Sequence, residues 1–387
     1  MIDTPQKDKF SLAEDITYLN TAYSAPLSKK AEQIGIEALR KKCSPHTSVG
    51  IDFFEPVEKL KSLFANLIDA PSSEDIAIIP SVSYGISIVA NNICLNEGEE
   101  IIVIGDQFPS NFYAWKRVAD KYNGTVKTVS APANPSNRGE TWNKNILEAI
   151  NENTALVAMA NVHWADGTIF NLKAIREKTA KNNALLIIDG TQSVGALPFS
   201  VKEIKPDALI CAGYKWLMGP YALGVAYFGE YFNNGVPLEE NWINRKNSED
   251  FAGLVNYEDN YKEGAYRYNM GEMSNFNLVP MLTQTIEQLI EWTPESIQNY
   301  CEEITKEAIE ELRLMGCFIE EDEYRAKHLF GVKLAGNMDM NLLQEALKAN
   351  QVYVSVRGEY IRVSPHVFNT KADLQKLVDC FKFCASS

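Results

Sequence analysis

Residues 184–228 read ALLIIDGTQSVGALPFSVKEIKPDALICAGYKWLMGPYALGVAYF, and three short apolar runs divide this stretch. The runs cover residues 184–189, 208–211 and 224–228 and are rich in Leu, Ile, Val and Ala. Apolar runs of this length between polar, glycine-containing segments are typical of strands that are buried on both faces of a sheet. The stretch therefore predicts three strands of a buried sheet.

The same pattern continues toward the N-terminus, where apolar runs alternate with longer helical patterns. We expect further strands at residues 76–79, 101–104, 126–129 and 155–160. We expect helices at residues 83–94, 111–122, 143–151 and 172–182. Buried strands that are joined by helical crossovers form parallel sheets, so the sequence predicts an α/β fold with a mainly parallel, seven-stranded sheet in a large domain.

The pattern changes after residue 275. Two long helices are predicted at residues 278–292 and 294–315. Shorter elements follow them, with strands expected at 317–320, 329–334, 352–356 and 360–363 and helices at 341–350 and 371–385. We expect a smaller C-terminal α/β domain over residues 276–387, a large domain over 46–275, and an N-terminal segment, 1–45, that packs on both.

Charge and composition restrict the possible partners. The 387 residues contain 37 Lys and Arg and 51 Asp and Glu, for a net charge of −14, which disfavours nucleic acid as a partner. An anionic ligand must therefore be held by local dipoles or by a few placed cations.

Seven scattered cysteines and a polar, acidic start predict a reduced, cytoplasmic protein. Residues 76–96 are uncharged but too polar for a membrane span, and the four histidines have no metal-site spacing.

Asp189 and Lys215 follow two predicted strands that are consecutive in the chain, so both are expected at the ligand-binding edge of the sheet. Aromatic and apolar residues flank Lys215, which favours its neutral, nucleophilic amine and Schiff-base chemistry. Asp189 ends a buried strand and needs a cationic partner such as a protonated pyridine nitrogen. Together they predict pyridoxal 5'-phosphate, with Gln192 available to the phenolic oxygen of its ring. The alternatives are a structural ion pair or two solvated loop residues.

A phosphate site is predicted where the strand at residues 76–79 runs into a helix. The connecting residues 80–85, PSVSYG, place backbone amides near Val82 and the hydroxyl of Ser83 at a helix N-terminus without charged side chains. Free N–H groups and the helix dipole favour an anion there. An ordinary serine cap without a ligand is the alternative.

Two motifs in this region resemble the cofactor signature of class V aminotransferases. They are DGTQSVG at residues 189–195 and GYKWLMGP at residues 213–220, and the resemblance extends from YLNTA at 18–22 to IRVS at 361–364. This family contains fold-type I pyridoxal-phosphate enzymes, among them cysteine desulfurases, kynureninases, isopenicillin N epimerase-like proteins and cysteine C–S lyases. The resemblance implies the fold-type I architecture, pyridoxal phosphate as cofactor and a small amino acid as substrate.

The resemblance also implies how the cofactor is held. Phe108 matches the position of a ring that stacks on the cofactor, and Tyr214 joins Ser83 and the amides near Val82 at the phosphate. His163 and Trp164 are expected at the rim of the cofactor, where His163 is either an acid–base group or a satisfied polar neighbour.

Substrate binding and assembly follow from the same resemblance. Arg362 matches the arginine that binds the substrate α-carboxylate, and Ala22 and Tyr23 are expected beside it. Segments that contain Trp242, Ser274 and Asn275 resemble those that reach the cofactor phosphate of a partner subunit, which implies a homodimer with shared active sites.

Departures from the family pattern bear on the reaction. Residues 351–362 contain no cysteine, which disfavours a persulfide-forming desulfurase, and Ala212 and Tyr214 replace a serine and a histidine of desulfurases. We therefore expect an aminotransferase or lyase that acts at Cα through Lys215. A kynureninase-like hydrolase and an isopenicillin N epimerase-like enzyme are the alternatives. A dehydrogenase or kinase is disfavoured because GxGxxG and GxxxxGK[ST] are absent, and so is a non-catalytic regulator.

Overall fold

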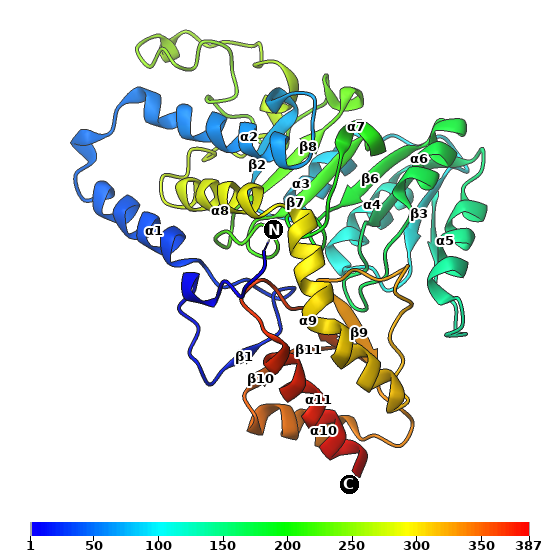
Figure 1. The fold of residues 1–387 in the computed structure, drawn as a ribbon. Coiled ribbons are helices and arrows are strands. Elements are labelled where there is room, and N and C mark those ends of the chain that lie inside the picture. Colours follow the sequence, from blue (N-terminus) through cyan, green and yellow to red (C-terminus); the bar gives the residue numbers. More distant parts are fainter. Residues whose placement is uncertain (1, 387) are drawn as a thin grey trace.

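A seven-stranded sheet forms the centre of the protein in the computed structural model, which describes residues 2–386 (Figure 1). The strands lie in the order β2 (Ile76–Ile79), β8 (Gly224–Phe228), β7 (Ala208–Ala212), β6 (Leu185–Asp189), β5 (Thr154–Ala160), β3 (Glu100–Ile104) and β4 (Thr125–Val129). β8 runs antiparallel to both of its neighbours, and the other adjacent strands pair in parallel. The predicted mainly parallel α/β sheet is confirmed.

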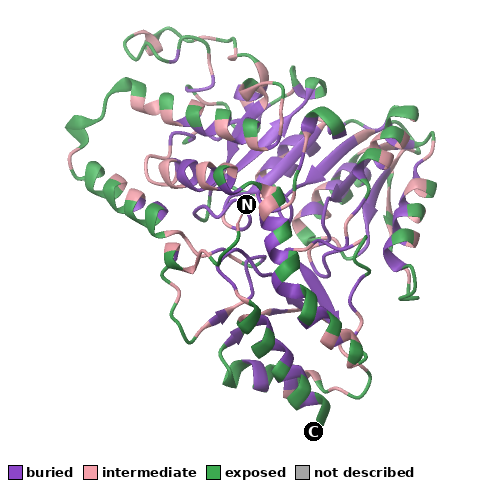
Figure 2. Ribbon diagram, in the orientation of Figure 1, coloured by how far each residue is buried: buried purple, intermediate pink, exposed green. Residues whose placement is uncertain are grey.

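Side chains cover this sheet on both faces. In β3, Ile101 and Val103 pack into one apolar cluster, whereas Ile102 and Ile104 pack into another on the opposite face. Figure 2 shows the strands almost entirely buried and the surrounding helices exposed on their outer sides. Burial on both faces explains why the strands appear in the sequence as continuous apolar runs instead of alternating patterns.

Helices follow most of the strands, with some bounds that differ from the prediction. The crossover helices are α3 (Val82–Asn91), α4 (Tyr113–Tyr122), α5 (Arg138–Ala149) and α6 (Leu172–Lys181). α5 begins five residues before the predicted start. Its first turn contains Arg138 and Gly139, which do not contribute to an apolar pattern in the sequence. Both are nevertheless buried, and Arg138 forms salt bridges with distant parts of the chain. Helices α1 (Lys29–Lys42), α2 (Glu55–Leu67) and α7 (Val201–Ile204) were not predicted.

The C-terminal part has its own small sheet. Helices α8 (Leu278–Trp292) and α9 (Pro294–Leu314) lead to it, and β11 (Ser355–Arg357), β12 (Tyr360–Val363) and β9 (Phe330–Lys333) form it with antiparallel pairing. α10 (Met340–Ala349) and α11 (Lys371–Ser386) lie beside it at the bottom of Figure 1. The strand expected at 317–320 is wrong, since Phe318 makes only an isolated bridge with Lys333. The strand expected at 352–356 is divided between β10 (Val352–Tyr353) and β11.

The N-terminal segment contacts both regions. β1 (Thr17–Tyr18) pairs in parallel with β10, and the amide of Ala25 donates to the carbonyl of Tyr214 in the loop that carries Lys215 (3.0 Å). Within residues 2–386, no helix has the length and apolar character that a membrane span needs. In the same range, no group of three or more His, Cys, Asp or Glu side chains is arranged to hold a metal ion.

Candidate active site

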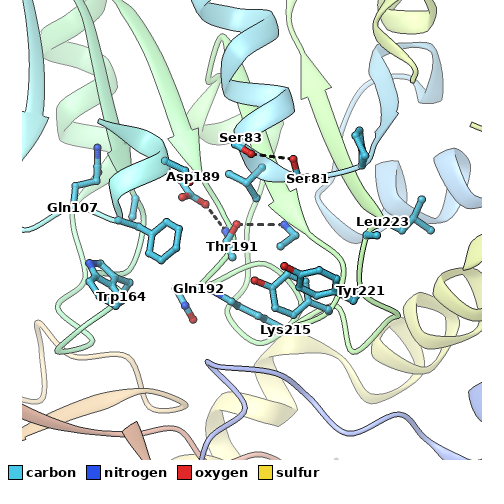
Figure 3. Close-up of a pocket in the computed structure, with 18 of the residues that line it drawn as sticks. Ser81, Ser83, Gln107, Trp164, Asp189, Thr191, Gln192, Lys215, Tyr221 and Leu223 are labelled. Atoms are coloured by element: carbon cyan, nitrogen blue, oxygen red, sulfur yellow. Dashed lines mark hydrogen bonds between the residues drawn. The ribbon is translucent and has the colours of Figure 1, made fainter. Parts of the chain in front are cut away.

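A cavity of about 320 Å³ lies at the carboxyl ends of β2, β3, β5, β6 and β7 (Figure 3). Parallel sheets bind their ligands at this edge, where strands give way to loops and helix N-termini. Nine of the residues predicted for the cofactor line the cavity: Val82, Ser83, Phe108, His163, Trp164, Asp189, Gln192, Tyr214 and Lys215. Five lining residues that carry polar side-chain groups were not predicted: Ser81, Gln107, Ser110, Thr191 and Tyr221.

Asp189 and Lys215 are both buried and do not neutralise each other. Each is only 8% exposed, and no salt bridge joins them within residues 2–386. Burial raises the pKa of Asp189, whose Oδ1 accepts a hydrogen bond from the Thr191 amide (2.9 Å). Burial, together with the positive charge of Arg362, lowers the pKa of Lys215 to about 8. The geometry excludes a direct structural ion pair between them, and each group is left in need of a partner.

Aromatic rings surround the amine. Lys215 Nζ lies 5.5 Å from the ring centroid of Phe108 and 5.6 Å from that of Tyr214. Trp164 packs edge-on against Phe108, with the two ring centroids 5.4 Å apart, and its indole Nε1 donates a hydrogen bond to the Asp106 carbonyl (2.6 Å). Phe108 is 42% exposed, so its ring is available to a planar ligand in the cavity.

The N-terminus of α3 forms one wall. Ser81 is its N-cap, with Oγ accepting from the Tyr84 amide (3.2 Å) and lying 3.0 Å from Ser83 Oγ. The first turn contains no acidic residue. A Cβ on Gly85 would lie 2.7 Å from Ile210 Cγ2, so glycine allows α3 to approach the sheet closely. This wall offers hydroxyls and free amides to an anion.

Gln192 and Thr191 are fixed by their neighbours. Gln192 Oε1 accepts from Trp216 Nε1 (2.8 Å), and its Nε2 donates to the Ala22 carbonyl (3.2 Å), which leaves one Nε2 hydrogen free. Thr191 Oγ1 accepts from the Ala212 amide (3.3 Å) and thereby links the ends of β6 and β7. Its position two residues after Asp189 was the signal that could have identified it.

His163 is oriented by a buried acidic group. Its Nδ1 lies 3.0 Å from Asp166 Oδ1, and Arg138 binds the other carboxylate oxygen (2.6 Å) and also Glu320 (2.7 Å). Although burial opposes ionisation, His163 and Arg138 lower the pKa of Asp166 below its usual range. His163 Nε2 is buried without a hydrogen-bond partner, so the ring has one free nitrogen at the cavity wall.

The residues predicted for the substrate lie beside the cavity and do not line it. Arg362 in β12 is 1% exposed and donates from Nη1 to the Trp164 carbonyl (3.0 Å), while its Nε and Nη2 have no partner. Burial lowers its pKa to about 9. Ala22 contributes its main chain to Gln192, and Tyr23 is 60% exposed.

Trp242, Ser274 and Asn275 do not reach the cavity of their own chain. Trp242 packs edge-on against Phe53 at 6.2 Å and is 39% exposed. Ser274 Oγ donates to the Phe53 carbonyl, and Asn275 Oδ1 accepts from the amide of Leu278 at the start of α8 (3.0 Å). None of the seven cysteines, all within the described range, lines the cavity.

Comparisons with known proteins agree with this geometry. The family model described as Aminotransferase class-V matches residues 41–377. An uncharacterised aminotransferase of Bacillus subtilis, YcbU, is 25% identical over 338 residues and covers 85% of each chain. A kynureninase of Geobacillus thermodenitrificans is 22% identical over 290 residues, covering 71% of this chain and 65% of its own. The apo cysteine desulfurase of Thermococcus onnurineus superposes with a TM-score of 0.83 at 18% identity, with 98% of each chain covered.

Proposed function

Because the chain belongs to the class-V aminotransferase family, we propose that it is a pyridoxal-phosphate-dependent enzyme that removes the Cα proton of a small amino acid. The observation that carries the proposal is the pair Asp189 and Lys215, two buried groups of opposite charge that lie at one cavity without a salt bridge between them. A ligand with a pyridine nitrogen and an aldehyde would serve both at once.

The residues present fit this cofactor. Asp189 is an unpaired buried carboxylate for the ring nitrogen, and the face of Phe108 is available to the ring. The α3 N-terminus, with Val82 and Ser83, offers donors to the phosphate, and the ring of Tyr214 lies 5.6 Å from Lys215 Nζ. Gln192 keeps one free N–H for the phenolic oxygen. When bound, pyridoxal phosphate supplies a ring that delocalises the electron pair left at Cα.

Lys215 has two roles in this scheme. Its Nζ holds the cofactor covalently at rest, which requires the neutral amine, and a pKa of about 8 makes that form accessible near neutral pH. Once the substrate amine has taken the place of Nζ on the cofactor, the free Nζ would take the proton from Cα and could deliver it to a different atom. Arg362 orients the substrate by binding its α-carboxylate, which places Cα within reach of the lysine.

We propose that the reaction after proton removal is a transamination or a β-elimination. Similarity to YcbU supports the first, and similarity to a cystine C–S lyase (TM-score 0.81) supports the second. A kynureninase-like hydrolysis remains the second candidate, because a kynureninase is among the relatives and Phe108 is an aromatic ring at the stacking position. An epimerisation would use the same proton transfer. A persulfide-forming desulfurase is disfavoured, since no cysteine lines the cavity within residues 2–386.

We further propose a homodimer in a reducing, cytoplasmic environment. Trp242, Ser274 and Asn275 would reach the phosphate of the partner subunit, which accounts for their distance from their own cavity. All seven cysteines are free, as a reducing compartment requires. We also propose that the chain is divided into an N-terminal segment (1–45), a large domain (46–275) and a small C-terminal domain (276–387). By this division α8 belongs to the small domain, and it packs against α1 and α2 of the other two parts.

A substrate panel tests the reaction. The purified holoenzyme is offered cysteine, cystine, kynurenine, alanine and serine, and sulfide, pyruvate, anthranilate and keto-acid transfer are measured, with Cα exchange in deuterated water measured in parallel. We expect Cα exchange with at least one amino acid and its loss in Lys215→Ala. A protein that binds the cofactor but exchanges no Cα proton of any amino acid tested would contradict the proposal.

A further inference from the structure

Two arginines gather with Lys215 on one side of the cavity. Arg357 ends β11, and Arg362 lies in β12. Their guanidinium carbons lie 5.6 and 6.0 Å from the ring centroid of Trp164, which lines the cavity. Both are near enough to Lys215 for their positive charges to lower its pKa. Three cationic side chains therefore surround the position expected for the substrate.

The strand pairing puts both arginines on one face. In the antiparallel pair β11–β12, Ser355 lies opposite Arg362, and Arg357 is two residues beyond Ser355. Residues two apart in a strand point to the same side, so Arg357 and Arg362 are diagonal neighbours, whose Cα atoms are typically about 7–8 Å apart. Two guanidinium groups on one face of neighbouring strands can bind two anionic groups of one small molecule.

Neither arginine has an acidic partner within residues 2–386. Arg357 Nη1 donates to the Val356 carbonyl (2.7 Å), and Arg362 Nη1 donates to the Trp164 carbonyl. The Nε of each arginine and Nη2 of Arg362 are buried without any acceptor. Burial lowers the pKa of both guanidinium groups, and the positive charge of Arg357 lowers the pKa of Arg362 further. Buried donors without acceptors are costly, which points to an anion that completes the site.

Other buried arginines of this chain do have acidic partners. Arg138 is bound by Asp166 and Glu320, and Arg325 by Asp322 at 3.1 Å. The chain has 51 acidic residues, 14 more than its 37 basic ones, so acids are not scarce. Among the described arginines, Arg267 also has a buried Nε without an acceptor and forms no salt bridge, but only Arg357 and Arg362 lie over the ring of a residue that lines the cavity, Trp164. One α-carboxylate would serve Arg362 and leave Arg357 without a partner.

We propose that the substrate is an amino acid whose side chain carries a second anionic group, such as a carboxylate, and that Arg357 binds this group while Arg362 binds the α-carboxylate. This inference rests on the proposed function, because it assumes that an amino acid occupies the cavity. Arg357 is only partly buried, and its guanidinium carbon lies 5.6 Å from the ring centroid of Trp164, which lines the cavity. It would determine specificity and take no part in proton transfer.

Binding of unreactive analogues tests the inference without any chemistry. Glutarate and its monoamide have the same length and differ in one negative charge, and calorimetry with the holoenzyme gives their affinities. A charged hydrogen bond predicts that glutarate binds at least about tenfold more tightly. In Arg357→Gln we expect this preference to disappear, whereas Arg357→Lys keeps part of it. Arg117→Gln, which removes an equal charge from the exposed side of α4, should leave the preference unchanged.

The reaction provides a second readout. With L-glutamate against L-glutamine and L-aspartate against L-asparagine, Arg357→Gln should raise KM for the acidic member of each pair and change kcat little. Equal affinity of the wild-type protein for glutarate and its monoamide would overturn the inference, as would a preference that survives in Arg357→Gln. Failure of the proposed function is a separate result, namely a protein without lysine-bound cofactor, and it is read from the absorption spectrum.

Discussion

Burial and the positive charge of Arg362 lower the pKa of Lys215 in the folded protein. Its folded-state pKa of about 8 lies below the usual lysine value of about 10.4, so at pH 7 about one tenth of the amine is neutral. Only the neutral amine attacks an aldehyde. We expect the rate at which the cofactor-free protein takes up pyridoxal phosphate to rise with pH through about 8 and to level off above it.

Arg362→Gln is the matched variant for this measurement. The positive charge of Arg362 contributes to the low pKa of Lys215, so its removal should move the inflection to higher pH. Stopped-flow absorbance between pH 6 and pH 11 measures both proteins. An inflection above pH 10 in the wild-type protein would show that burial does not perturb this amine.

Asp166 gives a residue-scale prediction about stability. Its pKa is lowered in the folded state, so it stabilises the fold above the ordinary aspartate pKa, and this contribution is lost as pH falls below that value. Asp166→Asn leaves Arg138 with one acidic partner and His163 with none, and should lower the free energy of unfolding by about 3–5 kcal/mol at pH 7. Urea unfolding of both proteins at pH 7 and pH 3 measures it, and the loss caused by Asp166→Asn should be smaller at pH 3 than at pH 7. No loss at pH 7 would contradict the prediction.

At the scale of elements, α3 combines a structural cap with the wall that we propose for the phosphate. Ser81 caps α3 and Ser28 caps α1 in the same way: the Oγ of each serine accepts a hydrogen bond of 3.2 Å from a backbone amide in the first turn. Replacing either serine by alanine should lower the free energy of unfolding by about 1 kcal/mol. We expect only Ser81→Ala to weaken retention of pyridoxal phosphate, measured by equilibrium dialysis. Equal retention in both variants would argue against a phosphate at α3.

The strands of the large sheet could be predicted because burial on both faces leaves continuous apolar runs. β2 and β8 agree with the prediction residue for residue, and β6 differs by one. Helix starts were less accessible, as α5 shows, because Arg138 is held there by Asp166 and Glu320, which are distant in sequence. The division of residues 352–356 between two sheets depends on pairing with β1, which no local pattern reveals.

The candidate site shows the same division between local and long-range information. Asp189 and Lys215 were predicted because strand ends of a parallel sheet converge, and the structure brings both to one cavity. Thr191, Tyr221 and the unpaired state of Arg357 were missed. The position of Thr191 two residues after Asp189 is a local signal. Tyr221 and Arg357 become evident only when the segments after β7 and β11 are placed beside the cavity, which is a property of tertiary packing.

At the scale of the whole molecule, a shared active site makes a complementation prediction. A Lys215→Ala chain and a Trp242→Ala chain are each expected to be inactive, and their mixed dimer should contain one intact site. Equal mixing with full exchange should restore about one quarter of the wild-type activity, because half of the dimers are mixed and each has one working site of two. Mixing without recovery, with exchange verified by mass spectrometry, would contradict the shared site.

The net charge of −14 completes the description at this scale. The acidic surface repels anions, so an anionic cofactor and substrate must be held by local groups. In the site that we propose, the uncharged start of α3 would hold the cofactor phosphate, and Arg357 and Arg362, which have no acidic partner in the described chain, would hold the substrate.

The attachment of pyridoxal phosphate to Lys215 can be measured directly. The protein is purified with the cofactor present, its absorption spectrum is recorded, and it is then reduced with borohydride, digested and mapped by mass spectrometry. We predict a yellow protein that loses its colour on reduction and carries the cofactor on the peptide that contains Lys215, with no label in Lys215→Ala and normal label in Lys121→Ala, a change at an exposed lysine. A wild-type protein that stays colourless with added pyridoxal phosphate, or one labelled only at other lysines, would contradict the assignment.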